Sequence, residues 1–469
     1  MTNVSGQASL YDLIVIGSGP GGQRAAVQAA KLGKKVAVVE KDLLGGACLQ
    51  LGTIPSKALR ESALMAQAGD MSLLGVMERT RRIIREEREV IEKSLRRNDI
   101  EFVRGTGRFQ DANTVIVEHE GVARKLSGRF ILIATGTRPR RAAEFDFDGF
   151  TVFDSDTILQ MKFQPRTMLV VGAGVIGVEY ASIFARTGVR VTLFDSKIDI
   201  LRNIDAGIVA ALKKQFEKNG MRLKLGWNLQ SVETVPGETG RAWRADATMS
   251  FDNEVVTEKY DAVLVCQGRT GNFELLNLGA VGLKPDDRGT LDVDANYRTS
   301  ATSGNIYAVG DIIGAPALAA SSSEQGRLAA LHMFTGADAS FPETFPYGIY
   351  TIPEISTVGV REEDLRDRGV RFVVGVANYS ELARGKMIED EFGFLKLIVH
   401  EQTRRIMGVH VIGTGATELV HIGQLCMAFG ATVDFLVDNV FNYPTLAEAY
   451  KVAAYNARNQ LTDLEGTSL

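Results

Sequence analysis

The chain contains the same glycine-rich turn twice, and this duplication constrains its fold more than any other feature. Residues 11–40 run from an apolar stretch through a glycine cluster and an Ala-rich helical stretch to a second apolar stretch that ends at Glu40. This pattern is typical of a β-strand, a tight turn, an α-helix and a parallel strand. It recurs at residues 166–195, and in both copies 23 positions separate the first glycine from the terminal acid, Glu40 or Asp195. Two copies with one spacing predict two Rossmann-like domains.

The three glycines of each turn have different physical roles. The first makes the tight turn, the second lets the backbone approach a pyrophosphate, and the third lets the helix pack close to the strand. The helix N-terminus attracts phosphates, and the terminal acid can accept hydrogen bonds from a ribose. The alternative is that the glycines only permit close packing in a domain that binds no nucleotide. They are Gly17, Gly19 and Gly22 in the first copy, and Gly172, Gly174 and Gly177 in the second.

Later stretches of the sequence complete this organisation. Three apolar runs that reach a glycine, within residues 130–139, 261–272 and 305–311, are predicted to add strands to the two sheets. From about Phe345 onward no nucleotide fingerprint appears, and alternating residues indicate antiparallel strands. The predicted fold class is α/β, with two Rossmann-like dinucleotide-binding domains and a C-terminal α+β interface domain. The predicted domains are 1–154 and 285–344 for the first nucleotide site, 155–284 for the second, and 345–469 for the interface.

Charge and cysteine content exclude several classes of protein. Lys and Arg number 53 and Asp and Glu 57, so a net charge of −4 offers no attraction to nucleic acid or to an anionic membrane. The longest apolar stretches reach about a dozen residues, short of the roughly 20 that span a bilayer. Three scattered cysteines suit a reducing compartment, and the five histidines lack metal-ligand spacing. We expect a cytoplasmic protein without a metal, nucleic acid or membrane partner.

Two dinucleotide domains in one chain suit an enzyme that passes an electron pair between two bound dinucleotides. A flavin and a nicotinamide are the obvious pair, because a flavin accepts hydride with little acid or base assistance. The two fingerprints alone do not assign either cofactor to either domain.

The segment 45–60, GGACLQLGTIPSKALR, resembles the flavoprotein disulfide reductase family. The resemblance covers nearly the whole chain, including ATG at 134–136, GRTGN at 268–272, YAVGD at 307–311, YTIPE at 350–354 and YPTLAE at 443–448. It implies non-covalent FAD in the first domain, NAD(H) or NADP(H) in the second, and a homodimer or larger homo-oligomer formed through the C-terminal domain. The residues it implies for FAD are Gly17, Gly19, Gly22, Glu40, Gly46, Cys48, Lys57, Gly136, Gly310 and Asp311, and those for NAD(P) are Gly172, Gly174, Gly177, Glu179, Asp195 and Gly268.

Two departures from the family pattern concern its chemistry. Disulfide-reducing members have C-x-x-x-x-C, whereas this chain has Cys48 and Thr53. Their C-terminal His is Tyr443 here, although Glu448 is retained. The combination resembles the soluble, Si-specific pyridine nucleotide transhydrogenase branch of the family. It implies a ping-pong transfer of hydride between NADPH and NAD+ through flavin N5.

The resemblance also implies roles for single residues. Lys57 and Glu179 would pair beside flavin N5, the alternative being a surface lysine and an ordinary helical carboxylate. Val175, in place of a tyrosine lid, would leave the nicotinamide pocket more open. Cys48 is an activated thiolate, a sensor thiol or an inert vestige, and the absence of a second cysteine favours the vestige. Cys266 and Cys426 lie in apolar stretches and are expected in the core.

Asp195 has two interpretations. An acid there suits the free 2′-hydroxyl of NAD(H) and repels the 2′-phosphate of NADP(H), for which Lys197 and Arg202 could compensate. Alternatively, Asp195 caps local backbone and the two cations face solvent. Two other functions fit the same residues: an NAD(P)H oxidase or diaphorase, and a flavin-binding or nucleotide-binding sensor without turnover.

Overall fold

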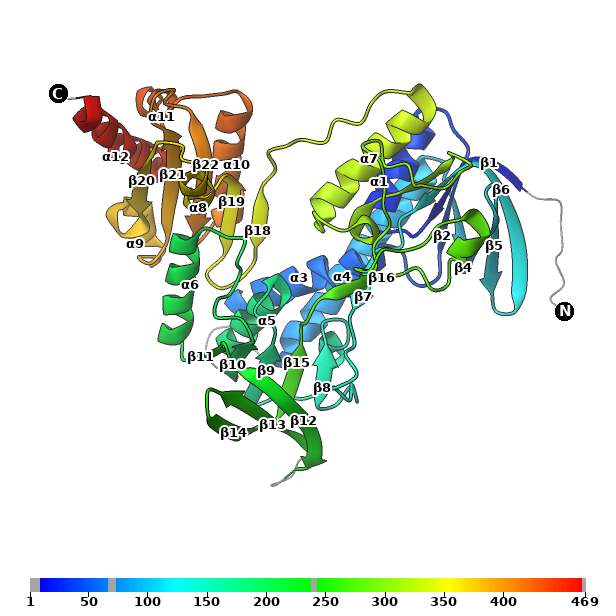
Figure 1. Ribbon diagram of the computed structural model, residues 1–469, viewed down its shortest axis with the longest axis horizontal. Coiled ribbons are helices and arrows are strands. Elements are labelled where there is room, and N and C mark those ends of the chain that lie inside the picture. The colour runs from blue at the N-terminus through cyan, green and yellow to red at the C-terminus, as the bar shows by residue number, and fades with distance from the viewer. Residues whose placement is uncertain (1–8, 66–72, 238–242, 466–469) are drawn as a thin grey trace. The chain divides into compact units, whose positions relative to one another are not determined.

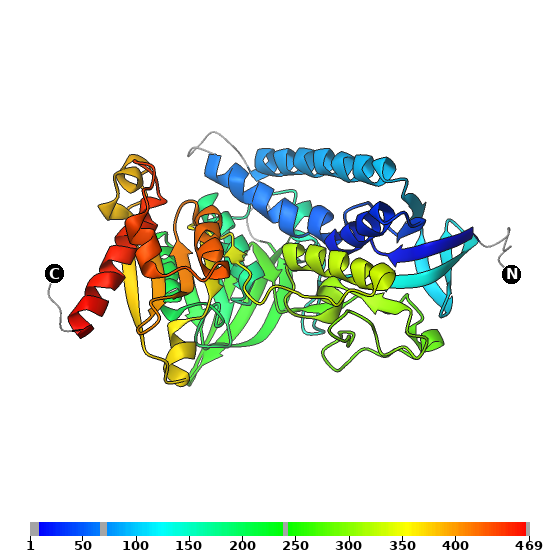
Figure 2. The same cartoon turned by 90° about the horizontal axis from the view of Figure 1, so that it is seen from above.

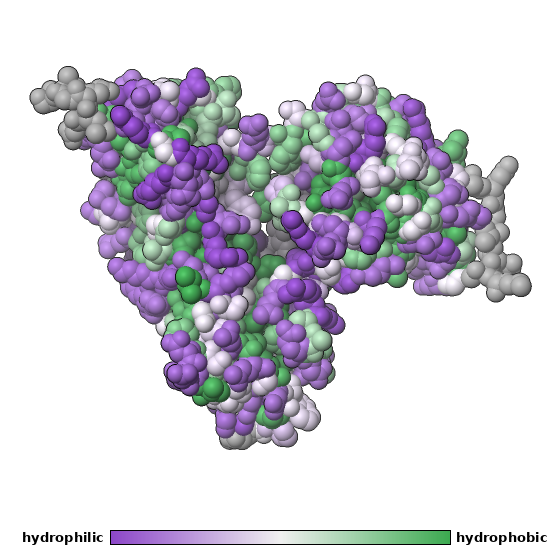
Figure 3. All heavy atoms as spheres, in the orientation of Figure 1, coloured by the Kyte–Doolittle hydropathy of each residue, from purple (hydrophilic) through white to green (hydrophobic). Residues whose placement is uncertain are grey.

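The computed structural model describes residues 9–65, 73–237 and 243–465. The chain forms two compact units, each built from two separate stretches of sequence (Figure 1). Unit 1 comprises residues 1–164 and 267–341, and unit 2 comprises residues 165–266 and 342–469. On the face shown in Figure 3, hydrophilic and apolar residues are interspersed. Among the described residues, no helix is both long and apolar enough to cross a membrane.

The core of unit 1 is a mostly parallel sheet built around the first glycine-rich turn. β1 (Ser9–Ile16) lies parallel to β2 (Val36–Glu40) on one side and to β6 (Val122–Ile133) on the other. The first half of β6 pairs antiparallel with β5 (Thr114–His119), so a hairpin extends the sheet. The strand order is β3-β2-β1-β6-β5-β4, and β17 also pairs with β6. The remaining strands of this sheet are β3 (Glu101–Arg104), β4 (Thr106–Asp111) and β17 (Ile306–Ala308).

Helices α1 (Pro20–Lys31) and α7 (Ala319–Thr335) lie side by side in unit 1 (Figures 1 and 2). Their backbones touch, since a Cβ built at Gly326 would lie 2.1 Å from the carbonyl oxygen of Gly21. Through this contact the second stretch of unit 1, residues 267–341, packs against the first stretch, residues 1–164. The other elements of unit 1 are α2 (Gly46–Gln50), α3 (Thr53–Met65), α4 (Leu73–Arg97), β7 (Thr137–Pro139), β8 (Val152–Asp154) and β16 (Arg269–Gly271).

Unit 2 repeats the arrangement around the second glycine-rich turn. β9 (Thr167–Val171) lies parallel to β10 (Arg190–Asp195) and to β15 (Ala262–Val265). The order β11-β10-β9-β15 places the carboxyl ends of parallel strands along one edge, where α/β sheets bind ligands. A three-stranded antiparallel sheet, β12-β13-β14, accompanies it. The other elements are α5 (Val175–Arg186), α6 (Ala206–Lys218), β11 (Arg222–Leu225), β12 (Asn228–Pro236), β13 (Trp243–Phe251) and β14 (Glu254–Tyr260).

The C-terminal part of unit 2 is an α+β module. Its antiparallel sheet has the order β18-β19-β22-β21-β20 and packs against α10 and α12 around a shared apolar core. The predicted fold class is therefore confirmed. The elements are β18 (Tyr347–Ile349), β19 (Ile355–Gly359), α8 (Glu362–Asp367), β20 (Phe372–Asn378), α9 (Ala383–Met387), β21 (Phe394–His400), β22 (Ile406–Ile412), α10 (Ala416–Ala428), α11 (Val433–Asp438) and α12 (Glu448–Glu465).

Each glycine of the second turn meets a different steric requirement. Gly172 has a φ of +106°, which side chains rarely tolerate. A Cβ at Gly177 would lie 1.8 Å from the Gly172 carbonyl oxygen, whereas nothing lies within 4 Å of a Cβ at Gly174. The first turn is alike: Gly17 has a φ of +107°, a Cβ at Gly22 would lie 2.1 Å from the Gly17 carbonyl oxygen, and Gly19 has open space.

We predict that Gly177→Ala and Gly174→Ala differ in stability although they change the same atoms. The methyl group at 177 must displace backbone, so the free energy of unfolding should fall by at least about 2 kcal/mol. At 174 the backbone is extended and the space is open, so the loss should stay below about 1 kcal/mol. Urea denaturation of the two variants measures the difference. Equal losses would contradict the steric account of the turn.

Candidate active site

Glu40, at the end of β2, stabilises the first glycine-rich turn by hydrogen bonds. Its Oε2 accepts hydrogen bonds from the N–H of Ser18 at 3.0 Å and from the Ser18 hydroxyl at 2.8 Å. The Ser18 hydroxyl oxygen also accepts the N–H of Gly45 at 3.0 Å. Gly46, the next residue, packs so close that a Cβ there would lie 2.9 Å from the Cα of Gly19. The turn, the end of β2 and the start of α2 are thus held together.

The residues around this turn fit a bound dinucleotide. Gly19 and Gly136 have nothing within 4 Å of an added Cβ, so their backbone is open to a ligand. The Thr135 hydroxyl is buried and has no hydrogen-bond partner among the described residues. Buried polar groups are normally satisfied, so this orphan points to a missing ligand or water. Gly19 is the N-cap of α1, and a helix N-terminus favours phosphate groups.

Gly310 and Asp311 lie at the carboxyl end of β17, on the ligand-binding edge of the sheet. The N–H of Gly310 donates to the side-chain oxygen of Gln325 at 2.8 Å. Asp311 accepts the Thr137 hydroxyl at 3.3 Å, and Arg269 donates to that hydroxyl at 2.8 Å. Our sequence reasoning missed Thr137 and Arg269 as supports of Asp311. Thr137 follows the ATG stretch and Arg269 lies in the GRTGN stretch. A local sequence pattern does not reveal their contact, because the two residues are 132 positions apart.

Cys48 lies in α2 as a half-buried free cysteine. Burial raises the pKa of its thiol, and the Asp311 charge adds to this increase, while a hydrogen bond with Thr53 and the charge of Lys57 partly oppose it. The thiol is therefore protonated at neutral pH, whereas an activated cysteine is a thiolate. Of the other two cysteines, Cys426 is buried as expected, but Cys266 lies one residue beyond β15 and is only half-buried.

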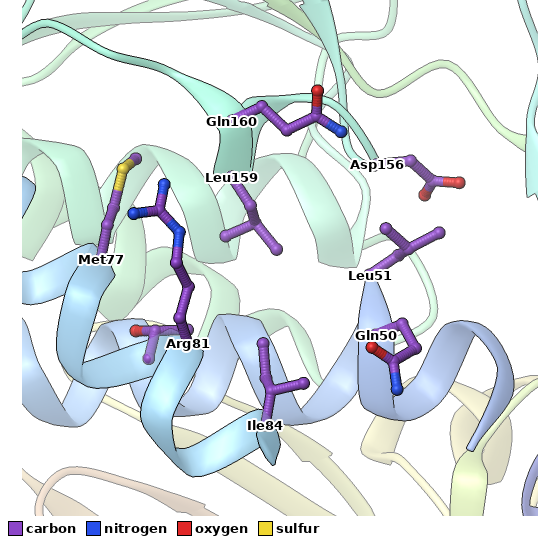
Figure 4. A pocket seen from close by; sticks show the side chains of 9 residues that line it. Gln50, Leu51, Met77, Arg81, Ile84, Asp156, Leu159 and Gln160 are labelled. Carbon is purple, nitrogen blue, oxygen red and sulfur yellow. The ribbon is translucent and has the colours of Figure 1, made fainter. Parts of the chain in front are cut away.

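A cavity of about 180 Å³ adjoins the segment that follows Cys48 (Figure 4). Ligand pockets commonly measure about 300–1,000 Å³, so this cavity is too small for a dinucleotide. Burial raises the pKa of Asp156 on its wall, against the opposing charge of Arg269. The cavity is lined by Gln50, Leu51, Met77, Thr80, Arg81, Ile84, Asp156, Leu159 and Gln160.

Asp195 holds the second glycine-rich turn much as Glu40 holds the first. Its Oδ2 accepts the N–H of Ala173 at 2.8 Å, and its Oδ1 accepts the N–H of Lys197 at 2.9 Å. Asp195 therefore caps local backbone, while the side chains of Lys197 and Arg202 are exposed. Each carboxylate oxygen accepts more than one hydrogen bond, so capping is compatible with recognition of a ribose.

Glu179, on α5, is buried with 4% of its surface exposed. Its Oε1 accepts the N–H of Tyr350 at 2.8 Å, and one turn later the Ser182 hydroxyl oxygen accepts the N–H of Ile352 at 3.1 Å. Helix α5 thus holds the YTIPE segment of the C-terminal part. Lys57 lies on α3 of unit 1, where its Nζ donates to the Ser56 hydroxyl at 3.3 Å. Because Lys57 and Glu179 belong to different units, their pairing stays a prediction.

The remaining predicted residues lie in turns or in the C-terminal part. Gly268 has a φ of +92° and open space for a Cβ, and its carbonyl oxygen accepts the N–H of Arg140 at 3.1 Å. Tyr443 is 73% exposed. Glu448 begins α12, and its Oε2 is buried without a hydrogen-bond partner in the part of the chain that the structure describes. In the described part of the chain, no three His, Cys, Asp or Glu side chains form a group that could hold a metal ion.

Comparison with known proteins identifies the family. Residues 11–326 match the family described as pyridine nucleotide-disulphide oxidoreductase, and residues 345–454 match the dimerisation domain of that family. Proteins named soluble pyridine nucleotide transhydrogenase are similar over nearly the whole chain. One from Mycobacterium bovis (strain BCG / Pasteur 1173P2) is 43% identical over 471 residues, covering 97% of this chain and 98% of that protein. One from Pseudomonas savastanoi pv. phaseolicola is 40% identical over 476 residues, covering 96% and 99%.

Solved structures share the fold. The Cu(II) complex of the HOCl-induced flavoprotein disulfide reductase RclA from Escherichia coli has a TM-score of 0.86 at 24% identity, covering 97% of this chain and 99% of that one. The resemblance read from the sequence motifs is thus confirmed at the level of the family. The Cys48 and Tyr443 positions lie inside the matched ranges. The chain belongs to the pyridine nucleotide-disulphide oxidoreductase family, whose members are oxidoreductases.

Proposed function

We propose that the protein is an FAD-dependent transhydrogenase that transfers hydride between NADPH and NAD+ in the cytoplasm. The observation that carries this proposal is the Cys48–Thr53 pair, in which a threonine hydroxyl stands where the disulfide-reducing members have their second thiol. A hydroxyl cannot form a disulfide, so the chain has no second redox couple at this position. The names of the relatives at 40–43% identity support the same activity.

Unit 1 would hold FAD without a covalent link. Gly19 and Gly136 offer open backbone, Glu40 lies at the end of β2 where it can accept from a ribose, and Thr135 offers an unused hydroxyl. Bound FAD would supply a ring that takes a hydride from one nicotinamide and returns it to another in a ping-pong cycle. Lys57, in the helix after Cys48, would place a positive charge near that ring.

Unit 2 would hold the nicotinamide nucleotide. Gly174 leaves space for the pyrophosphate at the N-terminus of α5, and Asp195 would accept from the adenosine ribose. Both nucleotides must bind for transhydrogenation, so the exposed cations Lys197 and Arg202 would offset the repulsion between Asp195 and a 2′-phosphate. Glu179 would complete the site beside the nicotinamide.

The chain would act as a homo-oligomer. The match to a dimerisation domain supports a homo-oligomer formed through the C-terminal part of the chain. Several large apolar side chains of that part are exposed in the single chain, which suits a surface that becomes covered. They are Leu425, Phe429, Phe435 and Val440.

We predict that the purified protein shows flavin bleaching with NADPH under anaerobic conditions and recovery of the flavin absorbance when NAD+ is added. A comparison of NADH consumption in air with hydride transfer to an oxidised nicotinamide analogue separates this activity from an oxidase or diaphorase. Consumption in air that exceeds transfer to the analogue would favour the oxidase. No bleaching with NADH or with NADPH would favour a sensor without turnover.

We predict that Asp195→Ser lowers kcat/KM for NADH by about 10-fold to 100-fold, because a charge-assisted hydrogen bond to the ribose is lost. The value for NADPH should fall less or rise. Asp199→Ser is a matched control, since Asp199 lies in the same loop but bonds only to Ile200 and Lys213 among described residues. Unchanged kinetics with both nucleotides would exclude a ribose-binding role for Asp195.

We predict that Cys48→Ser changes the rate of transhydrogenation by less than about 10-fold, because the neutral thiol has no redox partner. Flavin content must be measured with the rate, since this position adjoins the FAD site. Cys426→Ser, in the core of the C-terminal part, controls for the general effect of the substitution. A loss of more than about 100-fold with full flavin occupancy would show that Cys48 takes part in the chemistry.

A further inference from the structure

A buried charge cluster joins the nucleotide-binding part of unit 2 to its C-terminal part. Lys396, on β21, donates to both carboxylate oxygens of Asp205 at 2.9 and 2.8 Å and also contacts Glu362. Lys396 is 6% exposed and Asp205 is 0% exposed. Asp205 is the N-cap of α6, and the N–H of Ala206 donates to Glu363 at 3.2 Å. The start of α6 is thus fixed by β21 and α8.

Arg361, just before α8, also holds the loop before α6 through a hydrogen bond to the Arg202 backbone. Its Nε and Nη2 donate to the two oxygens of Asp364 at 2.9 and 2.6 Å, which fixes the plane of the guanidinium. Its Nη1 donates to the backbone carbonyl oxygen of Arg202 at 3.1 Å. A side chain of the C-terminal part therefore determines where the backbone of Arg202 lies.

The loop from Asp195 to Leu201 is hydrogen-bonded at both ends to the second glycine-rich turn. The N–H of Ala173 donates to Asp195 at 2.8 Å, and the carbonyl oxygen of Ala173 accepts the N–H of Leu201 at 3.2 Å. Both ends of the loop from Asp195 to Leu201 therefore meet at one residue of the turn. Arg202 is the next residue, so its backbone directly follows the residue that Ala173 holds, and Ala173 also donates to the carboxylate that would bind the adenosine ribose.

The charge of Arg202 is available to a ligand. Its side chain is exposed, and among the described residues no acidic side chain forms an ion pair with it. By contrast, Lys213 and Arg361 nearby are paired with Asp199 and Asp364. An available guanidinium next to a ribose-binding carboxylate suits a phosphate on that ribose.

We propose that Arg361 is a positioning residue for recognition of the 2′-phosphate of NADP(H), acting through its hydrogen bond to the Arg202 backbone. The inference rests on the proposed function for the placement of the adenosine ribose at Asp195. The C-terminal part would thereby contribute to the choice of nucleotide without contacting it. NADH lacks the phosphate, so its binding does not depend on the position of Arg202.

The experiment compares Arg361→Ala, Arg202→Ala and the double variant in the holoenzyme. Calorimetry gives the affinities for 2′,5′-ADP and for 5′-ADP, and steady-state kinetics give KM and kcat for NADPH and NADH. We expect Arg361→Ala to weaken 2′,5′-ADP binding about 3-fold to 10-fold and to raise KM for NADPH likewise. Affinity for 5′-ADP, KM for NADH and kcat should stay within about 2-fold.

Three comparisons separate a positioning role of Arg361 from a general structural effect. Arg371→Ala is the matched control, because Arg371 is paired with Glu401 at 2.8 Å in the same C-terminal part and has no described contact with Arg202. Asp364→Asn releases the Arg361 guanidinium without removing it, and should shift 2′,5′-ADP binding in the same direction by a smaller factor. In the Arg202→Ala background, Arg361→Ala should have no further effect, because the two residues act as one unit.

Equal losses for 2′,5′-ADP and 5′-ADP would overturn the proposal, as would no loss in Arg361→Ala or an additive loss in the double variant. Normal 2′,5′-ADP binding in Arg202→Ala would overturn it as well. These results would reject the role of Arg361 but would not count against the proposed transhydrogenase function. Conversely, the expected binding pattern in a protein that transfers no hydride would support the positioning role and reject the proposed function.

Discussion

The contact between the first and third glycines of each turn is the constraint on which the rest of the structure depends. At Gly177 and Gly22 the helix approaches so closely that one methyl group would overlap the carbonyl oxygen of the first glycine. Only this approach aims the helix N-terminus at the end of the first strand, where the terminal acid also arrives. The position of each helix N-terminus relative to its strand therefore depends on the absence of a single side-chain carbon.

The replacement of one cysteine by threonine shows how a shared scaffold changes its chemistry. The Thr53 hydroxyl opposes the rise in the pKa of the Cys48 thiol but cannot exchange electrons with it. Burial raises the pKa of the remaining thiol, so it is also a poor nucleophile at neutral pH. A chain that has both glycine-rich turns but has Thr53 in place of a second cysteine cannot form a disulfide at this position.

The sequence predicted those parts of the fold that depend on neighbouring residues, such as glycine turns and strands or helices with a regular apolar pattern. Glycine spacing and apolar periodicity located both βαβ units, and alternating residues indicated antiparallel strands after about Phe345, where β21 and β22 lie. The three-stranded sheet β12-β13-β14 was missed, because short strands of mixed polarity have weak periodicity. The backbone capping by Asp195 was only one of two open interpretations, since a terminal acid has the same spacing whether it binds backbone or ribose.

The long-range polar contacts could not be read from the sequence. Lys396 and Asp205 are 191 positions apart, and Arg361 and Arg202 are 159 apart. A lysine in an apolar strand predicts burial with a partner, but not which of 57 acidic residues that partner is. Such pairs form only when the segments that carry their members are already packed together, and removal of one member of a buried pair leaves an uncompensated buried charge. The Asp205–Lys396 pair thus shows how a contact far from the glycine-rich turn can fix the start of α6, because the position of this helix depends on the buried charge at its N-cap.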